Sequence, residues 1–494
     1  MNYRHPAGRL FCGVLSALAY WSLAGALSLA QETLVKDAPP LSLSSSNTFA
    51  AASGATPAGQ EPPNLEPLPG EPQPVQTQPT QPDESPSVGN QPTVETNGQP
   101  PVGQTSIPTV IINGAGHTIG NWHIRPTLGT TVAWDDNIFI SSVHRQAEFY
   151  TTISPGIAAG WGDFKQQLLG TAPYEHPFLW EPGDLQKRDY FYVQYTLSQN
   201  IFLRDASLNA LNQGAALDTQ FEFSKLTLRL RANALTLSDA DIQLGTRVNR
   251  SVDNVDLSST YALGEKTSLG IGFDENTNAY QGTTNFHGTA LDATEVANQD
   301  WFSYTISPKI IGSIGTRISY LDAQQTPGQF AEQILLRAVC QPGGKFSLDA
   351  AVGVEFRQVT GGSGITDGVF RFAGTYQPFD GTMLTLRASR LTESSPELAG
   401  QDETATSVDA EIHQRLFQKF HVILTAGYSD NVYFNVLTVV TQRKDNYVYV
   451  RPSIMFDINR WGSLQLSFQF QDNQSTSTFG FIDHQAMLQC NIVF

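Results

Sequence analysis

The segment FSLDAAVGVEF (346–356) alternates between apolar side chains and polar or small ones. Apolar residues occupy every second position from Phe346 to Phe356, whereas Asp349 and Glu355 stand on the intervening positions. Successive side chains of a β-strand point to opposite faces, so the segment predicts a strand with one apolar and one polar face. The preceding Pro-Gly-Gly (342–344) predicts a tight turn, which makes this strand half of a hairpin.

The same period of two continues from about Trp122 to the end of the chain. It is clear in LTLRLRANA (226–234), VDLSSTYALGEKTSLGIGF (255–273) and IMFDINRWGSLQLSFQF (454–470). Counting such runs gives about twenty strands. The count falls to about eighteen if the two short runs within residues 205–223 are not strands. Each run is close to the roughly 9–11 residues that a membrane strand needs. We therefore expect an all-β fold, a transmembrane antiparallel up-and-down β-barrel of about 18–20 strands.

The connections between these strands alternate in length. Tight turns are predicted at GWGD (160–163), LGEK (263–266) and NRWG (459–462). Long polar loops are predicted at DDNIFISSVHRQAEF (135–149), YEHPFLWEPGDLQKRD (174–189), DENTNAYQGTTNFHGTALDATEVANQD (274–300) and LTESSPELAGQDETATS (391–407). Short turns at one end and long loops at the other are typical of bacterial outer-membrane barrels. Prolines in ISPGI (153–157) and VRPSI (450–454) are expected at strand ends or bulges.

A soluble β-sandwich or barrel also alternates, but its apolar face points inward, and a chain of this length would need several domains. No linker follows residue 122, and the polar face carries scattered charges of both signs among small residues, which suits a hydrated lumen. The candidate lumen-lining residues are Arg229, Arg231, Asp349, Glu355, Arg387, Asp409, Glu411 and Arg451. The arginines could attract anions, or pair with the acids across the lumen and close it; the sequence leaves both open.

Aromatic residues gather near the predicted strand ends, where interfacial girdles of membrane proteins lie. They are Trp134, Tyr150, Trp161, Tyr190, Trp301, Tyr320, Tyr376, Tyr428, Tyr447 and Trp461. Together with the alternation, they favour a membrane barrel over a soluble one.

The first part of the chain has a different composition. Residues 1–30 combine a basic start, an apolar run and the small-residue exit Ser-Leu-Ala, which predicts a secretory signal peptide. Residues 31–121 are rich in Pro, Gln and Thr without periodicity, which predicts a disordered periplasmic tether. Residues 122–494 form the predicted barrel. The formal net charge of −17 argues against nucleic acid as a partner.

The last residues continue the alternation up to Phe494. This ending resembles the carboxy-terminal assembly signal of outer-membrane proteins, carried here by Leu488, Cys490, Ile492 and Phe494. The resemblance implies the barrel-assembly machinery and outer-membrane lipids as partners. Separately, WDDNIF (134–139), YSDNVYF (428–434), YTISPKI (304–310) and YALGEKTSL (261–269) resemble the beta-barrel porin-2 group. Members of that group often accompany exopolysaccharide production, which implies polysaccharide-export components as further partners.

No residues form a recognisable catalytic or cofactor motif. The repeated Asp-Asn at Asp135–Asn137 and Asp430–Asn431 suits calcium or sugar, but turn chemistry explains it more simply. His413 and His421 flank a predicted turn without a nucleophile motif. We therefore expect no enzymatic activity, no metal and no cofactor. The predicted function is a porin-like conduit for passive passage or polysaccharide export. The alternatives are a non-conducting structural or adhesive barrel that binds a partner through its tether or long loops, and an outer-membrane lipid-modifying enzyme.

Overall fold

The computed structural model describes residues 117–162, 189–281, 290–362 and 364–494. The predicted signal peptide and almost all of the predicted tether, residues 1–116, lie outside the described residues. Within them, no helix has the length and apolarity needed to cross a membrane.

Apart from one short 3-10 helix, the regular elements of the described residues are strands. The elements are β1 (His117–Ile119), β2 (Trp122–Asp135), β3 (Glu148–Gly162), β4 (Tyr190–Phe202), η2 (Ala206–Leu208), β5 (Ala210–Glu222), β6 (Leu226–Asp241), β7 (Thr246–Ala262), β8 (Thr267–Gln281), β9 (Ala293–Ser307), β10 (Ile310–Ala323), β11 (Gln329–Gly343), β12 (Phe346–Val359), β13 (Ile365–Phe379), β14 (Thr382–Ser394), β15 (Gln401–Leu416), β16 (Phe420–Asn435), β17 (Val440–Asn459), β18 (Gly462–Ser475) and β19 (Phe481–Val493).

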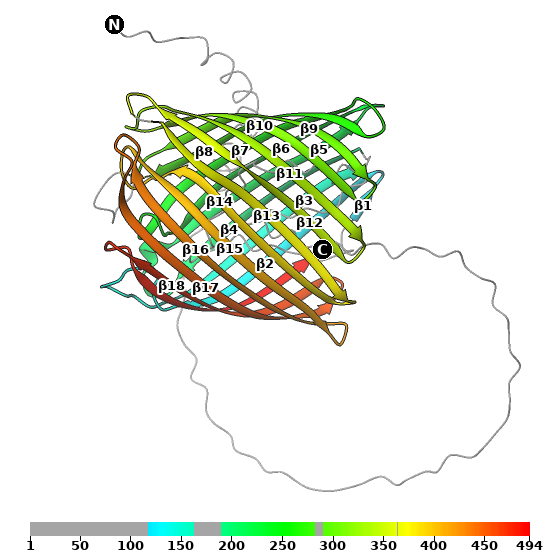
Figure 1. The fold of residues 1–494 in the computed structure, drawn as a ribbon. Coiled ribbons are helices and arrows are strands. Elements are labelled where there is room, and N and C mark those ends of the chain that lie inside the picture. Colours follow the sequence, from blue (N-terminus) through cyan, green and yellow to red (C-terminus); the bar gives the residue numbers. More distant parts are fainter. Residues whose placement is uncertain (1–116, 163–188, 282–289, 363) are drawn as a thin grey trace, which may run out of the picture. The chain divides into compact units, whose positions relative to one another are not determined.

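These strands form one closed antiparallel barrel (Figure 1). From β2 to β19 each strand pairs with the next along the chain, and β19 pairs with β2, so that eighteen strands close the wall. The short β1 is an addition beside the start of β2. At the closure, Phe494 donates its backbone N–H to the carbonyl of Pro126 at 2.9 Å. The predicted fold class is confirmed, with the last strand closing against the first long one.

The two faces of the wall differ as the alternation predicts. On β11 and β12, Leu336 and Val352 are 57% and 55% exposed, while their neighbours Leu335 and Ala351 are fully buried. The same outward apolar pattern recurs around the barrel, and polar residues such as Arg337 and Glu355 occupy the buried inward positions. Because the apolar side chains cover the outside, this arrangement is the reverse of a soluble barrel.

The strands are longer than predicted: the shortest barrel strands have 13 residues and β17 has 20. The apolar outer positions do not cover this length, since β17 starts with the polar run Thr441–Asp445. The predicted length of roughly 9–11 residues counts only the segment inside the hydrocarbon core, and the strands continue beyond it.

The barrel has two different ends, named here by their connections. The turn end holds the connections 223–225, 263–266, 308–309, 344–345, 380–381, 417–419 and 460–461; the loop end holds 136–147, 203–209, 242–245, 282–292, 324–328, 360–364, 395–400, 436–439 and 476–480. One prediction about them is wrong. There is no tight turn at GWGD (160–163), because β3 continues to Gly162 and β4 begins at Tyr190 at the turn end. The long loop predicted at 174–189 lies, except for Asp189, outside the described residues; Gly160 is a strand residue opposite His123 and Tyr192.

The aromatic girdle is confirmed only in part. Tyr320 and Trp461 are 52% and 45% exposed, as an outward girdle requires. Four of the ten aromatic residues are instead buried on the inward face: Tyr150, Tyr190, Trp301 and Tyr447. Inside the barrel two of them form hydrogen bonds through their hydroxyl groups: Tyr190 donates to Asp218 at 3.0 Å and Tyr447 to Gln471 at 2.6 Å. Position near a strand end does not determine the face, which depends on the register.

The prediction for the prolines fails at two sites. Pro155 lies within β3 and Pro452 within β17, without a change of register at either position. Next to Pro155 the pairing with β4 passes directly from Ile153↔Gln199 to Gly156↔Thr196. Proline removes one ladder donor on one side of the strand, so the partners on the other side hold the register.

Candidate functional site

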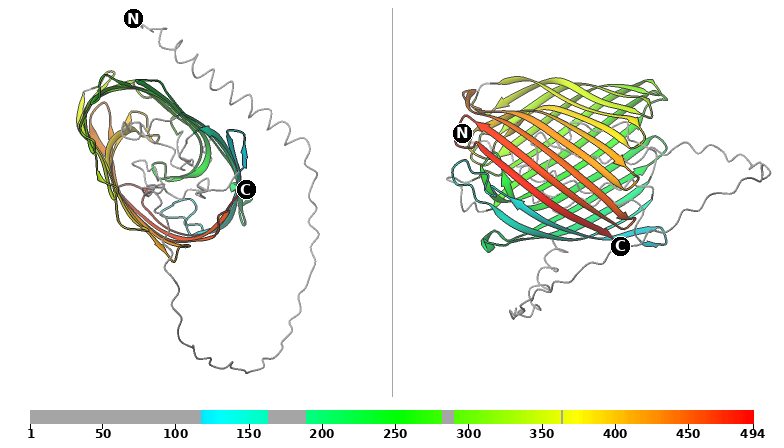
Figure 2. Two further views of the ribbon diagram at one scale, coloured as in Figure 1. Left: turned by 90° about the vertical axis from the view of Figure 1, so that its right-hand side faces the viewer. Right: turned by 90° about the horizontal axis from the view of Figure 1, so that it is seen from below.

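The loops at the loop end fold into the barrel interior. Ile138 and Ile140 of connection 136–147 are 1% and 2% exposed, and Ile242 and Leu244 of the β6–β7 turn are 4% and 2% exposed. Ile140 and Ile242 belong to one buried apolar cluster, whose other members are Ala240 of β6, Tyr447 and Tyr449 of β17, and Phe481 of β19. In the view along the barrel in Figure 2, cyan and green segments lie inside the oval ring of strands. The interior is thus narrowed at this end.

Two backbone positions show how closely these loops are packed. A Cβ atom on Gly245 would stand 2.5 Å from the ring of Phe479, and its φ of +60° suits glycine. Ile140 has a φ of 47°, an unfavourable value for a β-branched residue. Burial of its side chain and the hydrogen bond from its N–H to the carbonyl of Asn137, at 2.7 Å, hold it there. Such strain persists only where the surroundings over-determine the conformation, and it often marks functional sites.

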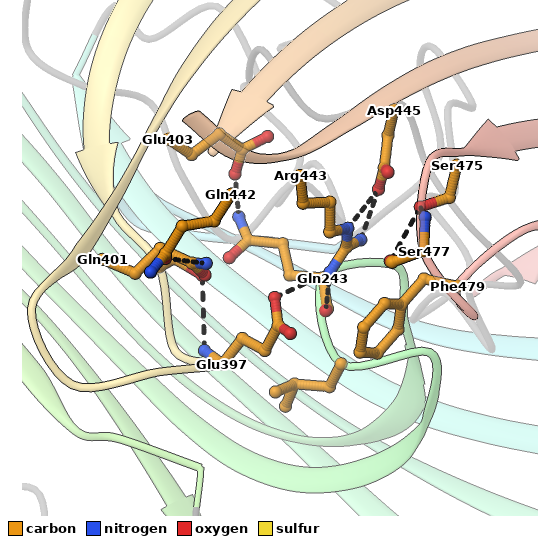
Figure 3. A network of polar contacts seen from close by, with 12 residues as sticks. Gln243, Glu397, Gln401, Glu403, Gln442, Arg443, Asp445, Ser475, Ser477 and Phe479 are labelled. Atoms are coloured by element: carbon orange, nitrogen blue, oxygen red, sulfur yellow. Dashed lines mark hydrogen bonds and ion pairs between the residues drawn. The ribbon is translucent and has the colours of Figure 1, made fainter. Parts of the chain in front are cut away.

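Arg443 of β17 is the centre of the inward-folded loops (Figure 3). Its guanidinium donates to the backbone carbonyls of Gln243 and Ile242, at 2.8 and 3.3 Å. It also forms ion pairs with Glu397, at 2.9 Å, and with Asp445. Arg443 is 3% exposed, so these contacts replace its hydration shell.

Aromatic and polar neighbours complete this network, which we name the Arg443 network. The Arg443 guanidinium lies over the rings of Tyr433 and Phe479, 4.3 and 3.9 Å from their centroids. Gln243 donates to Glu403, and Gln401 donates to Gln442 at 2.9 Å (Figure 3). Cationic guanidinium groups bind aromatic faces favourably, more so without water. The network joins the β6–β7 turn to strands on the opposite side of the ring.

The connection 395–400 is tied to other loops as well. The N–H of Leu291 donates to the carbonyl of Pro396 at 3.1 Å, and the N–H of Gly400 donates to Thr326 at 2.9 Å. Burial raises the pKa of Glu397 in this connection, although Arg443 acts in the opposite direction. These three connections and the Arg443 network therefore support one another at the loop end.

Ion pairs run along the inner wall, both within a strand and between strands up to three apart. Arg317 pairs with Asp274 and Glu295, and Arg357 pairs with Glu355 and Asp402. All six side chains are at most 13% exposed. These pairs neutralise charge along the wall itself, which differs from the predicted alternative of pairing across the lumen.

The predicted lumen residues fall into two groups. Arg229 is paired with Asp218 at 2.8 Å, Arg231 with Asp256 at 3.4 Å, Asp349 with Arg337, and Glu355 with Arg357 at 2.9 Å. Arg387 lies opposite Asp409 in the β14–β15 register, with Glu411 two residues from Asp409 on the same face. Arg387 and Arg451 are half-buried in the interior and interact electrostatically with Asp409 and Glu411, although neither forms a direct ion pair with a carboxylate of the described residues.

In this second group, Gly427 of β16 leaves room for a hydrogen bond between side chains of β17 and β15, the two strands on either side of it. Tyr449 of β17 donates its hydroxyl to Asp409 of β15 at 2.6 Å, across the strand between them. A Cβ atom on Gly427 would lie 2.2 Å from the Tyr449 ring and 2.4 Å from the Asp409 carboxylate. Only glycine leaves room for this contact.

The first Asp-Asn motif lies in a cluster of carboxylates at the loop end. Oxygens of Asp135, Asp136 and Asp483 are within 4.8 Å of one another. Asp136 accepts from Arg145 at 2.6 Å and from the His484 ring at 2.9 Å. Burial acts to raise the pKa of Asp136, but the His484 hydrogen bonds and Arg145 outweigh it and lower the pKa.

Asn137 shows that this motif also does turn chemistry. Its N–H donates to Asp135 at 2.8 Å, and its amide donates to the carbonyls of Ser141 and Ile482, both at 3.0 Å. The second copy is not a turn: Asp430 lies within β16 and pairs with Lys444 at 3.1 Å. The two copies therefore have different local roles.

Sequence reasoning missed Arg443 as a functional residue. Its partner carbonyl belongs to Gln243, 200 residues earlier in the chain. One available signal is the position of Arg443 on the face of β17 that also carries Tyr447 and Tyr449, both fully buried. That pattern indicates an inward face but does not identify the residues that Arg443 contacts.

Comparisons with known proteins give similar barrels among solved structures. The structure of OpdK of Pseudomonas aeruginosa with vanillate is 9% identical, with a TM-score of 0.39 over 75% of this chain and 99% of that one. OccAB4 of Acinetobacter baumannii is 10% identical, with a TM-score of 0.39 over 75% and 98%. No protein-family model and no curated protein matches the sequence.

Proposed function

We propose that this chain is a porin-like conduit of the bacterial outer membrane, which lets small polar solutes pass without covalent chemistry. The observation that carries the proposal is the pairing of an apolar outer face with a polar, charged interior in a closed barrel. Closure satisfies the strand hydrogen bonds inside a bilayer, where open sheet edges do not occur. Outer-membrane lipids are then the partners of the outer face.

In this proposal Leu488, Cys490, Ile492 and Phe494 form the assembly signal read by the barrel-assembly machinery. These residues alternate along β19 and its end, and Leu488 and Phe494 are 45% and 46% exposed on the outer face. In this proposal the turn end, where β2 begins, lies on the periplasmic side.

The second candidate is a non-conducting structural barrel, and a specific observation favours it. The β6–β7 turn crosses to β17 and is held by the buried Arg443, so the interior is narrow at the loop end. Polysaccharide export, as implied by the beta-barrel porin-2 resemblance, would require this turn to move aside. A lipid-modifying enzyme is less well supported, since no hydroxyl or thiol of the described residues is hydrogen-bonded to His413 or His421.

Single-channel recording in planar bilayers tests the proposal. A porin-like conduit should give discrete conductance steps in KCl and should allow small sugars to swell liposomes. A preparation with native heat-modifiable mobility that shows neither steps nor swelling would support the structural barrel instead.

Arg387 and Arg451 should set the ion preference of the conduit. Both act electrostatically on Asp409 and Glu411 without a direct ion pair among the described residues, so we expect them to raise the local anion concentration more than a directly paired arginine does. Replacing both by glutamine should shift the zero-current potential in a KCl gradient towards that of a cation-preferring pore. The control is Arg229→Gln, which removes an arginine already paired with Asp218. Equal shifts in both variants would contradict a special role for Arg387 and Arg451.

A further inference from the structure

Two methionines and two histidines form a row across four neighbouring strands near the turn end. Met383 of β14 lies directly opposite His413 of β15, and Met455 of β17 lies directly opposite His421 of β16. Between them, His413 Nε2 and His421 Nδ1 are 2.9 Å apart. Directly opposite residues of an antiparallel pair have Cβ atoms roughly 4.5–5.5 Å apart. The row is therefore continuous.

All four side chains belong to the inner face of the wall. The intervening positions carry exposed outward residues: Ile412 is 44% exposed, Val422 39% and Ile454 52%. Met383 is 8% exposed, and His413, His421 and Met455 are half-buried. The row is thus shielded from lipid and faces the interior of the barrel.

Asp457 defines the hydrogen-bonding state of the histidines. His421 Nε2 lies 3.0 Å from Asp457 Oδ2, and a carboxylate accepts, so His421 carries its proton on Nε2. Its Nδ1 then offers a lone pair, which accepts from His413 Nε2–H. An imidazole that donates to a carboxylate and directs its other nitrogen inward has the arrangement of a metal-binding histidine.

The placement of the methionines is selective. The chain has only four methionines, and two of the three that follow Met1 flank this histidine pair. Leucine would fill the same space with little loss, because leucine and methionine exchange at small cost. What methionine adds at these positions is a thioether sulfur.

We propose that Met383, His413, His421 and Met455 form a binding site for a soft monovalent metal ion, copper(I), on the inner wall of the barrel. Thioether sulfur selects copper(I), and imidazole nitrogen also suits copper. The ion takes the place of the proton between His413 Nε2 and His421 Nδ1. That proton moves to His413 Nδ1, so binding releases no net proton. Asp457 positions His421 and is not itself a ligand. The site adds a binding activity to the barrel and does not depend on conduction.

The test is a competition titration of the full barrel in detergent, without oxygen, using copper(I) and a coloured copper(I) chelator. The wild type should bind one ion per chain. His413→Gln and His421→Gln should abolish binding, Met383→Leu and Met455→Leu should each weaken it, and Asp457→Asn should weaken it ~10-fold. X-ray absorption of the loaded protein should show sulfur neighbours that are absent from the Met383→Leu/Met455→Leu double variant.

Met487→Leu is the matched control. Met487 lies on β19 beside Ala133, Tyr150 and Phe202, away from the histidine row, so this variant should bind like the wild type. Native mobility on unheated gels confirms that each variant is folded. Binding that survives both methionine substitutions, or tighter binding of zinc(II) than of copper(I), overturns the proposal. Because the titration needs no bilayer, its outcome is independent of whether the barrel conducts.

Discussion

Replacing Arg443 by alanine is expected to release the β6–β7 turn from the opposite wall and to raise the conductance of the barrel several-fold. The substitution leaves the buried Asp445 and Glu397 without their cation, and two backbone carbonyls lose their donor. Breaking a buried ion pair by removing one partner costs about 3–5 kcal/mol. The free energy that holds the turn in place should fall by an amount of that order.

Two measurements check this prediction. Single-channel steps should become larger than in the wild type, and amide hydrogen exchange in 242–245 should become faster. The double variant Arg443→Gln/Asp445→Asn removes the cation together with its most deeply buried partner and should lose less stability than Arg443→Ala, because only Glu397 is then left without its cation.

Arg390→Ala is the matched control for Arg443→Ala. Arg390 pairs with Asp367 at 2.9 Å, but the two side chains are 34% and 28% exposed. Such a pair contributes only about 0–1 kcal/mol, so conductance and exchange at 242–245 should stay as in the wild type. The same result for Arg443→Ala would show that the Arg443 network does not limit passage.

Replacing Val352 by arginine is expected to destabilise the barrel in a lipid bilayer by about 2–4 kcal/mol, the cost of a lipid-facing arginine near the midplane. Val352 lies in the middle of β12 and is 55% exposed on the outer face. The guanidinium has no polar partner on that face and would have to leave the hydrocarbon core. The measurement is the denaturant dependence of folding into phospholipid vesicles.

Ile306→Arg provides the depth control. Ile306 is 60% exposed and lies one residue from the end of β9, where a long side chain reaches the interface. There the cost should fall to about 0–1 kcal/mol. In a protein whose outer face meets water, the two substitutions would have similar small effects, and that outcome would contradict the membrane location.

The proposed metal site was predictable from the sequence only in part, namely the position of its two histidines beside one turn. His413 and His421 flank a turn in the sequence, and the structure joins them at 2.9 Å through that turn. The methionines beside them come from other strands, so their position depends on the register of β14 and β17. A slip of one residue in either strand would turn the methionine to the lipid face.

The sequence by itself determined the closed barrel, the apolar outer face, and the closure of β19 against β2. Alternation with period two is a local signal, readable within one strand, and each strand pairs with its neighbours along the chain. Only the tertiary structure decided which loops fill the interior, which aromatic residues point inward, and what Arg443 binds. Gln243 and Arg443 are 200 residues apart, and their contact depends on the curvature of the whole ring. No pattern within a single strand carries that information.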